Sequence, residues 1–374
     1  MSSIFMPDFP IYFTYNPINQ MRRIYLDYAS LTPIDNGVMK QMKKYSTQEY
    51  SNPMSYYASA VNAKKAIEGA QERIANVLHA HPDEIIFTSG GTESNNLVLQ
   101  NKINKHIITS AIEHSSIINP IQATHISVDA NGMINLDLLK KSITSETTIV
   151  SVMLVNNEIG TIEPLSEIAK IVRDARKNYG GQFPLLHTDA CQAIAHIPIY
   201  VEKLGVDLIS LDGHKVYGPR GIGMLYVRRG TLNIERAGTA NVPGIMGLAY
   251  AIELTEKIRE KETARIADLK EYFVNELIGI DSGIRINGDL YNFSPHILNV
   301  SIPNIDNEFF VLQLDARGIE CSTKSACLKD EEESYVLKEI GANSKNSIRF
   351  SFGRNTTKGE LKDVIKVITQ ILQK

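Results

Sequence analysis

Short apolar runs alternate with amphipathic segments over the first 230 residues, and this alternation limits the possible fold more than any other feature. The runs 84–87, 148–155 and 206–211 have the length and apolar character of buried strands. The intervening segment 165–179 has helical periodicity and ends at a pair of glycines. Strands that alternate with helices favour a mostly parallel sheet flanked by helices on both faces, so we expect an α/β fold.

The periodicity changes near residue 250, which indicates a second structural unit. Residues 247–279 are strongly helical, and short strands then alternate with helices over 296–372. A chain of 374 residues also exceeds what one hydrophobic core usually supports, so we expect two domains. The expected parts are an N-terminal extension (1–20), a large domain (21–250, of which 21–35 can pack with the small domain) and a small α+β domain (251–374).

The composition excludes several classes of protein. The net charge is −3 and there is no basic tract, so we expect no nucleic-acid partner. No apolar run is long enough for a membrane helix, so we expect no membrane association. Three cysteines without a C-x-x-C pair fit a reduced, cytoplasmic protein that uses at most one thiol chemically. Two short pairs of potential metal ligands lack a third converging ligand, so we expect no metal site.

One lysine occupies an unusual position in the segment 205–228. A buried strand is followed by Asp212-Gly213-His214-Lys215, and a second strand begins at Ile222. A lysine on such a tight connection contributes little to the core. A sheltered amine with a lowered pKa, in contrast, can act as a nucleophile and form a Schiff base. We therefore interpret Lys215 as the anchor of a pyridoxal 5'-phosphate (PLP) cofactor.

The other groups that PLP chemistry needs also follow predicted strands. Asp189 can keep the pyridine nitrogen protonated, so that the ring accepts electrons. The turn at Gly91-Thr92 leads into a helix, whose exposed N–H groups suit a phosphate. Arg349 or Arg354 can bind a substrate carboxylate through two parallel hydrogen bonds. Such side chains are expected together at the carboxyl edge of the sheet.

Together these segments resemble the cysteine desulfurases of the NifS/IscS type, within the class V aminotransferase family. The resemblance rests on ten segments in family order from residue 24 to about 370: YLDYAS, SNP, TSGGTESNNL, EHSS, VNNEIGT, HTDACQ, DGHKVYGPRGIG, RAGTANVPGI, CSTKSAC and IRFSFGRNTT. It implies PLP-dependent transferase fold type I, with a large domain around a mostly parallel sheet and a smaller α+β domain.

The resemblance also implies an activity and its partners. The chain would be a homodimer that converts L-cysteine to L-alanine and holds the sulfur as an enzyme persulfide. That sulfur would pass to an acceptor protein, either a scaffold for iron–sulfur cluster assembly or an enzyme of tRNA thiolation.

The same resemblance assigns roles to individual residues. The catalytic residues would be Lys215, which carries the cofactor, His114, which stacks on its ring, and Cys327, which accepts the sulfur. The cofactor-binding residues would be Gly91, Thr92, Asn157, Asp189, Gln192, Asp212, His214 and, across the dimer interface, Thr239. The substrate would bind to Arg349, with Asn157 nearby and Arg354 as a second candidate.

Three departures from the family pattern bear on activity. Asp212 replaces a serine that donates to the phosphate, and an ionised carboxylate there would repel the phosphate, turn away or be protonated. A glycine-rich segment that normally precedes Arg236 is missing. Lys324 replaces a glycine close to Cys327, where its charge would favour the thiolate while the acidic run 330–333 would oppose it.

Two other functions remain open. The chain could be a selenocysteine lyase or another class V enzyme, although an ordinary aminotransferase needs no thiol such as Cys327. It could also be a catalytically weakened paralogue that acts as a binding or regulatory protein, which Asp212 and the missing glycine-rich segment motivate.

Overall fold

A computed structural model describes residues 23–101, 105–324 and 333–373. Its centre is a seven-stranded sheet with the strand order β2-β8-β7-β6-β5-β3-β4. The strands are β2 (Ile85–Thr88), β3 (His106–Ser110), β4 (Thr124–Ile126), β5 (Thr147–Ser151), β6 (Leu185–Asp189), β7 (Leu208–Asp212) and β8 (Gly223–Val227). Strand β8 runs antiparallel to both of its neighbours, β2 and β7, and the remaining strand pairs of this sheet are parallel. The expected α/β fold with a mostly parallel sheet is therefore confirmed.

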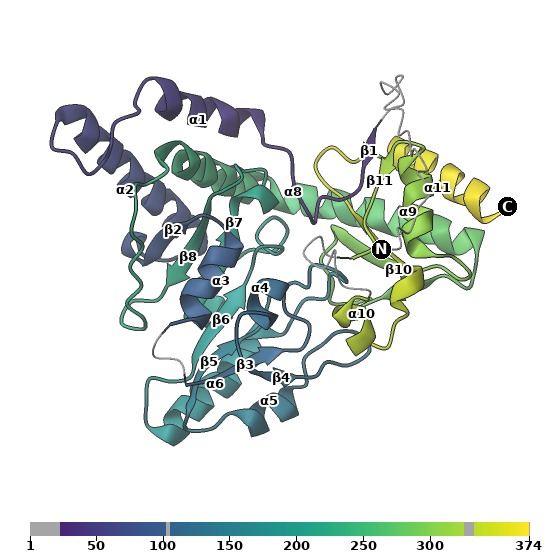
Figure 1. Ribbon diagram of the computed structural model, residues 1–374, viewed down its shortest axis with the longest axis horizontal. Coiled ribbons are helices and arrows are strands. Elements are labelled where there is room, and N and C mark those ends of the chain that lie inside the picture. The colour runs from purple at the N-terminus through teal and green to yellow at the C-terminus, as the bar shows by residue number, and fades with distance from the viewer. Residues whose placement is uncertain (1–22, 102–104, 325–332, 374) are drawn as a thin grey trace, which may run out of the picture.

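Helices flank this sheet, and a long one leads away from it (Figure 1). They are α1 (Asn36–Thr47), α2 (Ala58–Leu78), α3 (Gly91–Leu99), α4 (Ser115–Ile118), α5 (Leu136–Ser142), α6 (Leu165–Tyr179), α7 (Val201–Leu204) and α8 (Val242–Ile280). Helix α6 illustrates why they form, because its residues Leu165, Ile168, Ala169, Val172 and Ala175 repeat at helical spacing and are all buried.

A smaller part of the chain forms its own layer at the far end of α8 (Figure 1). An antiparallel sheet of order β12-β10-β9 joins Ser347–Ser351, Ile297–Ser301 and Arg285–Asn287. A two-stranded parallel sheet joins β1 (Ile24–Tyr25) to β11 (Ile319–Glu320). The helices of this part are α9 (Asn307–Asp315), α10 (Tyr335–Glu339) and α11 (Lys358–Leu372).

Helix α8 connects two hydrophobic cores. Its first part, up to Ile252, packs in the core of the large sheet, whereas Ile266 and Phe273 pack in the core of the smaller part. The domain boundary expected between residues 250 and 251 therefore falls inside a continuous helix. Because β1 pairs with β11, the N-terminal strand lies with the smaller part of the fold.

A row of polar side chains links three central strands of the large sheet. His187 on β6 makes hydrogen bonds to Ser151 on β5 (2.8 Å) and Ser210 on β7 (3.0 Å). All three residues are fully buried, and burial lowers the pKa of His187 to about 4. The ring is therefore neutral at physiological pH, and its two nitrogens act as one donor and one acceptor. This row therefore links β5, β6 and β7 through their side chains.

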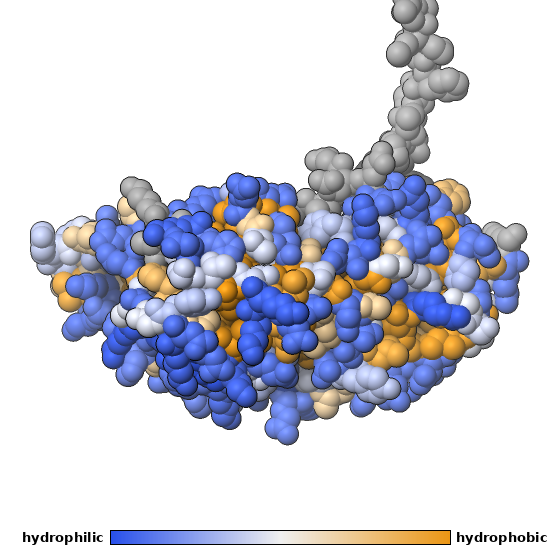
Figure 2. Space-filling model, turned by 90° about the horizontal axis from the view of Figure 1, so that it is seen from below, coloured by the Kyte–Doolittle hydropathy of each residue, from blue (hydrophilic) through white to orange (hydrophobic). Residues whose placement is uncertain are grey.

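Figure 2 shows one face of the molecule, on which hydrophilic residues surround smaller hydrophobic areas. None of the helices in the described ranges is both long and apolar enough to cross a membrane.

We predict that Gly223→Ala lowers the free energy of unfolding by about 3 kcal/mol, because a new Cβ on β8 would meet immovable backbone atoms. That Cβ would lie 2.6 Å from both the Gly90 Cα and the Leu211 carbonyl oxygen. Gly69→Ala is the matched control, since Gly69 lies within α2 and a Cβ added there would meet no neighbouring atom within 4 Å. This control should stabilise the protein by about 0.5–1 kcal/mol. Urea denaturation checks both values, and an unchanged midpoint for Gly223→Ala would contradict the packing argument.

Candidate active site

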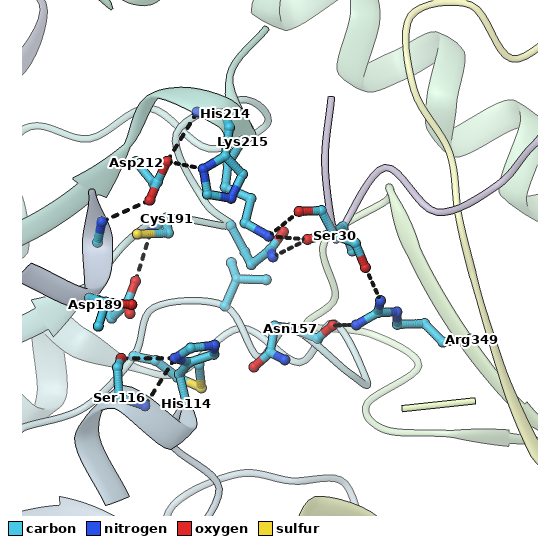
Figure 3. A pocket seen from close by; sticks show the side chains of 16 residues that line it. Ser30, His114, Ser116, Asn157, Asp189, Cys191, Asp212, His214, Lys215 and Arg349 are labelled. Carbon is cyan, nitrogen blue, oxygen red and sulfur yellow. Dashed lines mark hydrogen bonds and ion pairs between the residues drawn. The ribbon is translucent and has the colours of Figure 1, made fainter. Parts of the chain in front are cut away.

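A cavity of about 270 Å³ lies where the central strands of the large sheet end. Ten of the residues predicted from the sequence line it: Gly91, Thr92, His114, Asn157, Asp189, Gln192, Asp212, His214, Lys215 and Arg349. Figure 3 shows that they come from the turns after several strands and, in the case of Arg349, from β12 of the smaller part. The cavity therefore lies between the two parts of the fold.

Lys215 is the last residue of a short 3₁₀ helix, Gly213–Lys215, which follows β7. Its Nζ donates hydrogen bonds to the carbonyl oxygens of Ala29 (2.6 Å) and Ser30 (2.7 Å), as Figure 3 shows. Burial and, to a smaller extent, the charge of Arg349 lower the pKa of Lys215. A lowered pKa increases the fraction of neutral amine, which is the nucleophilic form.

Asp189 lies at the end of β6 and faces the same cavity. Its Oδ2 accepts a hydrogen bond from Asn95 Nδ2 (2.8 Å), and its Oδ1 accepts one from the Cys191 backbone N–H (2.9 Å). The residue is buried, so these two donors hold the carboxylate in one orientation. A fixed, buried carboxylate can keep a proton on a ring nitrogen that enters the cavity.

His114 caps the N-terminus of α4. Its Nδ1 accepts a hydrogen bond from the Ser116 backbone N–H (3.2 Å), and it also lies 2.8 Å from Ser116 Oγ. Because Nδ1 acts as an acceptor, the proton of the neutral ring belongs on Nε2. The ring is thereby held in a single tautomer beside the cavity.

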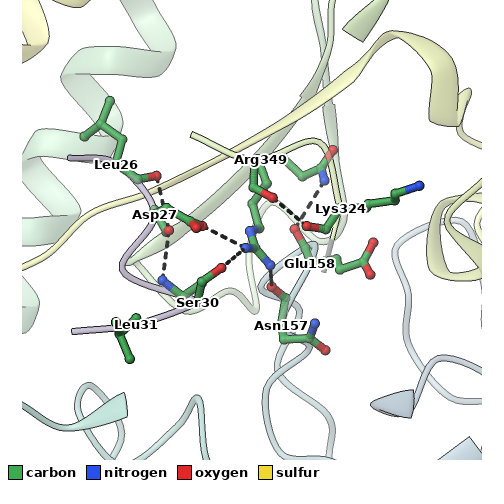
Figure 4. Close-up of polar contacts among 12 residues, drawn as sticks. Leu26, Asp27, Ser30, Leu31, Asn157, Glu158, Lys324 and Arg349 are labelled. Carbon is green, nitrogen blue, oxygen red and sulfur yellow. Dashed lines mark hydrogen bonds and ion pairs between the residues drawn. The ribbon is translucent and has the colours of Figure 1, made fainter. Parts of the chain in front are cut away.

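Arg349 is 2 % exposed and is held by three contacts (Figure 4). One terminal nitrogen contacts Asp27 Oδ1 and Ser30 Oγ, each at 2.9 Å, and the other donates to the Asn157 carbonyl oxygen at 2.9 Å. Within the described residues, Arg349 Nε and Asn157 Oδ1 are both buried without a hydrogen-bond partner. Unsatisfied buried polar atoms are costly, so this pair fits a cavity that receives a polar ligand.

A hydrogen-bonded chain that the sequence analysis missed orients Gln192. Gln192 Nε2 donates to the Ala29 carbonyl oxygen (2.8 Å), so its Oε1 faces His296 Nε2 at 3.1 Å. His296 Nδ1 in turn lies 2.8 Å from Ser294 Oγ. Burial, followed by the neighbouring His196, holds the pKa of His296 well below its usual value. Its neutral ring can then donate from Nε2 and accept at Nδ1. No sequence signal links these residues, because His296 and Gln192 are 104 positions apart.

The N-terminus of α3 carries the most unexpected contact. The Gly91 N–H, at the start of this helix, donates to Asp212 Oδ2 (2.8 Å). Asp212 Oδ1 accepts from the His214 N–H (3.0 Å) and forms an ion pair with the His214 ring. Burial alone would raise the pKa of Asp212, but the hydrogen bonds and charge of His214 hold it below its ordinary value. The carboxylate has therefore neither turned away from this corner nor become neutral.

Two predicted site residues lie elsewhere, and a third falls outside the described residues. Thr239 lines a separate cavity together with Arg236. The Arg354 guanidinium lies 3.9 Å from the centre of the Tyr217 ring, outside the lining of the main cavity. Cys327 lies outside the described residues, as does most of the acidic run 330–333. Neighbouring Lys324 is described, and its carbonyl oxygen accepts a hydrogen bond from Ser322 Oγ (2.6 Å).

The pKa values of the two described cysteines are both raised. Burial raises the pKa of Cys191 well above its usual value, and it raises that of Cys321 as well. Cys191 lines the cavity beside Asp189 and Asp212, whose negative charges disfavour a thiolate further. Neither thiol has the environment of an activated nucleophile.

Comparison with known proteins agrees with this geometry. The Aminotransferase class-V family model matches residues 24–235 and 233–364. A cysteine desulfurase IscS from Dictyoglomus turgidum is 40% identical, with 94% of this chain and 95% of that protein covered. Another from Methanosarcina thermophila is 36% identical, with 96% and 94% covered.

Solved structures extend the comparison to three dimensions. A NifS-like protein matches with a TM-score of 0.86 and 32% identity, with 94% of this chain and 100% of that chain covered. A structure described as SspA in complex with cysteine matches with a TM-score of 0.75 and 30% identity, with 88% and 98% covered. The resemblance inferred from the sequence segments is confirmed, and the chain belongs to the class-V aminotransferase family.

Proposed function

We propose that this chain is a PLP-dependent cysteine desulfurase, which removes sulfur from L-cysteine and releases L-alanine. The observation that carries the proposal is the convergence of Lys215, Asp189, His114 and Arg349 on one cavity. Support for the substrate comes from the relatives named cysteine desulfurase and from the structural neighbour bound to cysteine.

Apart from Asp212, the predicted residues that line the cavity fit the PLP cofactor. Lys215 would carry it covalently, Asp189 would hold the ring nitrogen protonated, and Gln192 would donate its second amide N–H to the ring hydroxyl. The phosphate would lie toward the N-terminus of α3, near Gly91, Thr92 and His214, which line that end of the cavity. Bound PLP supplies an electron sink that stabilises negative charge at the substrate Cα.

The chain's own residues would bind the substrate and move its protons. Arg349 carries an unpaired Nε and a fixed guanidinium, so it is the better candidate than Arg354 for binding the substrate carboxylate. Asn157 Oδ1 offers an acceptor next to it. The neutral amine of Lys215 can remove a proton from Cα, and His114 Nε2 can supply one to the leaving fragment.

Cys327 would accept the sulfur. Its thiolate would attack the substrate sulfur, forming an S–S bond while the C–S bond breaks, and the carbon fragment would keep the electron pair and take up a proton as alanine. The high pKa values of Cys191 and Cys321 leave Cys327 as the candidate nucleophile among the three cysteines. The persulfide would then pass its outer sulfur to an acceptor protein.

The partners are part of the same proposal. We place the enzyme in the cytoplasm as a homodimer, with Thr239 reaching the cofactor of the second copy. The surface position of Thr239, in a cavity separate from Lys215, suits a contribution across a dimer interface. A weakened, binding-only paralogue is the second candidate, and the carboxylate of Asp212 at the α3 N-terminus is the observation that favours it.

We predict that purified protein given PLP becomes coloured and releases sulfide and alanine from cysteine. Cys327→Ala should keep the colour but lose roughly 100-fold or more of its sulfide release, because only the acceptor thiol is removed. Cys321→Ala is the control and should keep both, since the raised pKa of that thiol disfavours the thiolate. Undiminished sulfide release by Cys327→Ala would contradict the persulfide role, and colourless protein would contradict the enzyme assignment.

We also predict that His296 positions Gln192. In His296→Leu the Gln192 amide loses its fixed orientation, so kcat should fall roughly 10-fold with a smaller change in KM. For the same reason, the pH titration of the visible cofactor band should shift. His296→Asn can still donate to Gln192 Oε1 and should restore most of both properties. Steady-state kinetics and absorption spectra measure the effect. Equal behaviour of the leucine and asparagine variants would show that His296 only fills space.

A further inference from the structure

The N-terminus of α3 and the neighbouring His214 form a site suited to an anion, and the carboxylate of Asp212 occupies it. We call this site the corner. Helix α3 has nine residues, and the N–H of its first residue, Gly91, donates to Asp212 Oδ2 at 2.8 Å. The His214 N–H donates to Asp212 Oδ1 at 3.0 Å, and the His214 ring pairs with the same oxygen. Figure 3 shows these contacts converging on the carboxylate from two sides. A helix N-terminus together with a histidine is an arrangement that proteins use to bind phosphate.

The backbone around this carboxylate leaves space for it. A Cβ on Gly90 would lie 2.7 Å from Asp212 Oδ2, whereas one on Gly91 would first meet Cys191 Sγ, at 2.6 Å. Asp212 is 7 % exposed, and its pKa is held low by His214 against the effect of burial. The donors at this helix N-terminus therefore already bind a negative charge, and that charge is the side chain of Asp212.

The location of this corner relates it to the cofactor proposed above. Asp212, His214 and Gly91 line the same cavity as Lys215, and Asp212 is only three residues before that lysine. A cofactor attached at Lys215 would bring its phosphate to the N–H groups that Asp212 now occupies. Two anions cannot share these donors without strong repulsion, since like charges a few ångströms apart in a partly buried site disfavour each other.

We propose that Asp212 acts as an internal substitute for the cofactor phosphate and so determines how strongly this chain distinguishes PLP from pyridoxal. The inference rests on the proposed function, because it assumes that the cofactor attaches at Lys215. The phosphate of PLP would have to displace the Asp212 carboxylate from Gly91 and His214. The free energy lost in breaking these hydrogen bonds would cancel most of the binding free energy that the phosphate gains from the same donors. Wild-type protein therefore gains little affinity from the phosphate group.

Asp212 also has a local structural role, so a test variant must keep the hydrogen bond that it makes to the backbone. Its side chain caps the 3₁₀ turn that carries Lys215 by accepting the His214 N–H. Asp212→Ser keeps an oxygen that can accept this hydrogen bond and removes the charge. Asp212→Asn keeps the shape and the acceptor but is neutral. Either variant should preserve the turn while it frees the corner for phosphate.

The test compares two aldehydes on full-length protein from which bound cofactor has been removed. PLP and pyridoxal are titrated separately, and the visible absorption band gives each dissociation constant. In wild type the two constants should differ by less than about tenfold. Asp212→Ser should bind PLP at least about tenfold more tightly, the size expected for restoring charge-assisted hydrogen bonds, with pyridoxal binding unchanged. Asp212→Asn should change in the same direction.

Glu93→Gln is the matched control. Glu93 is another carboxylate in the first turn of α3, but it accepts from the Ser89 N–H and pairs with Arg236 rather than with Gly91. Its removal should leave the ratio of the two dissociation constants as in wild type. If Asp212→Ser binds PLP no more tightly than wild type, or gains equally for pyridoxal, the proposal is wrong.

A second measurement is independent of attachment at Lys215. Inorganic phosphate should raise the melting temperature of cofactor-free Asp212→Ser but not that of wild type, because only the variant has free donors at α3. Equal shifts in the two proteins would overturn the proposal. A protein that forms no coloured band with either aldehyde would refute the proposed enzyme function instead, while the phosphate result would still decide the role of Asp212.

Discussion

The short segment at Ala29-Ser30 ties the two parts of the fold together at the active site. The Ala29 carbonyl oxygen accepts from both Lys215 Nζ (2.6 Å) and Gln192 Nε2 (2.8 Å), whereas its N–H donates to Ser351 Oγ (2.9 Å) on β12. Ser30 contacts Lys215 through its carbonyl oxygen and Arg349 through its hydroxyl. Lys215, which follows β7 of the large sheet, and Arg349 on β12 of the small sheet therefore both contact Ser30, the lysine at its carbonyl oxygen and the arginine at its hydroxyl.

Charge sets the second constraint on this site. Lys215, Arg349, Asp189 and Asp212 all border one small cavity, so each must have a partner or a shifted pKa. Arg349 is paired with Asp27, and Asp212 is paired with His214. Lys215 Nζ, in contrast, donates to two backbone carbonyl oxygens, and burial lowers its pKa. The amine of Lys215 is thus held by uncharged acceptors, and its lowered pKa favours the neutral, nucleophilic form.

Much of the fold and of the site could be predicted from the sequence, because strand ends carry their polar residues in a recognisable order. Lys215, Asp189 and Arg349 were all found in this way and meet in the cavity. The segment YLDYAS contains Ala29 and Ser30, but their contacts with Lys215 could not be predicted, because these contacts use backbone carbonyl oxygens, which the residue types do not reveal. His296 was missed because its contact with Gln192 depends on how two distant segments fold together. The predicted domain boundary near residue 250 lies within α8, whose first part packs in one hydrophobic core and whose later part packs in the other.

We propose that Lys215, and no other lysine, carries the cofactor, and borohydride reduction followed by peptide mass spectrometry tests this most directly. A useful internal comparison is Lys270, whose pKa burial lowers to about 7, but which contacts the Ile297 carbonyl oxygen away from the cavity lining. Protein treated with PLP and then reduced should carry one pyridoxyl group, on the peptide that contains Lys215. Modification of Lys270 or of surface lysines in its place would contradict the account.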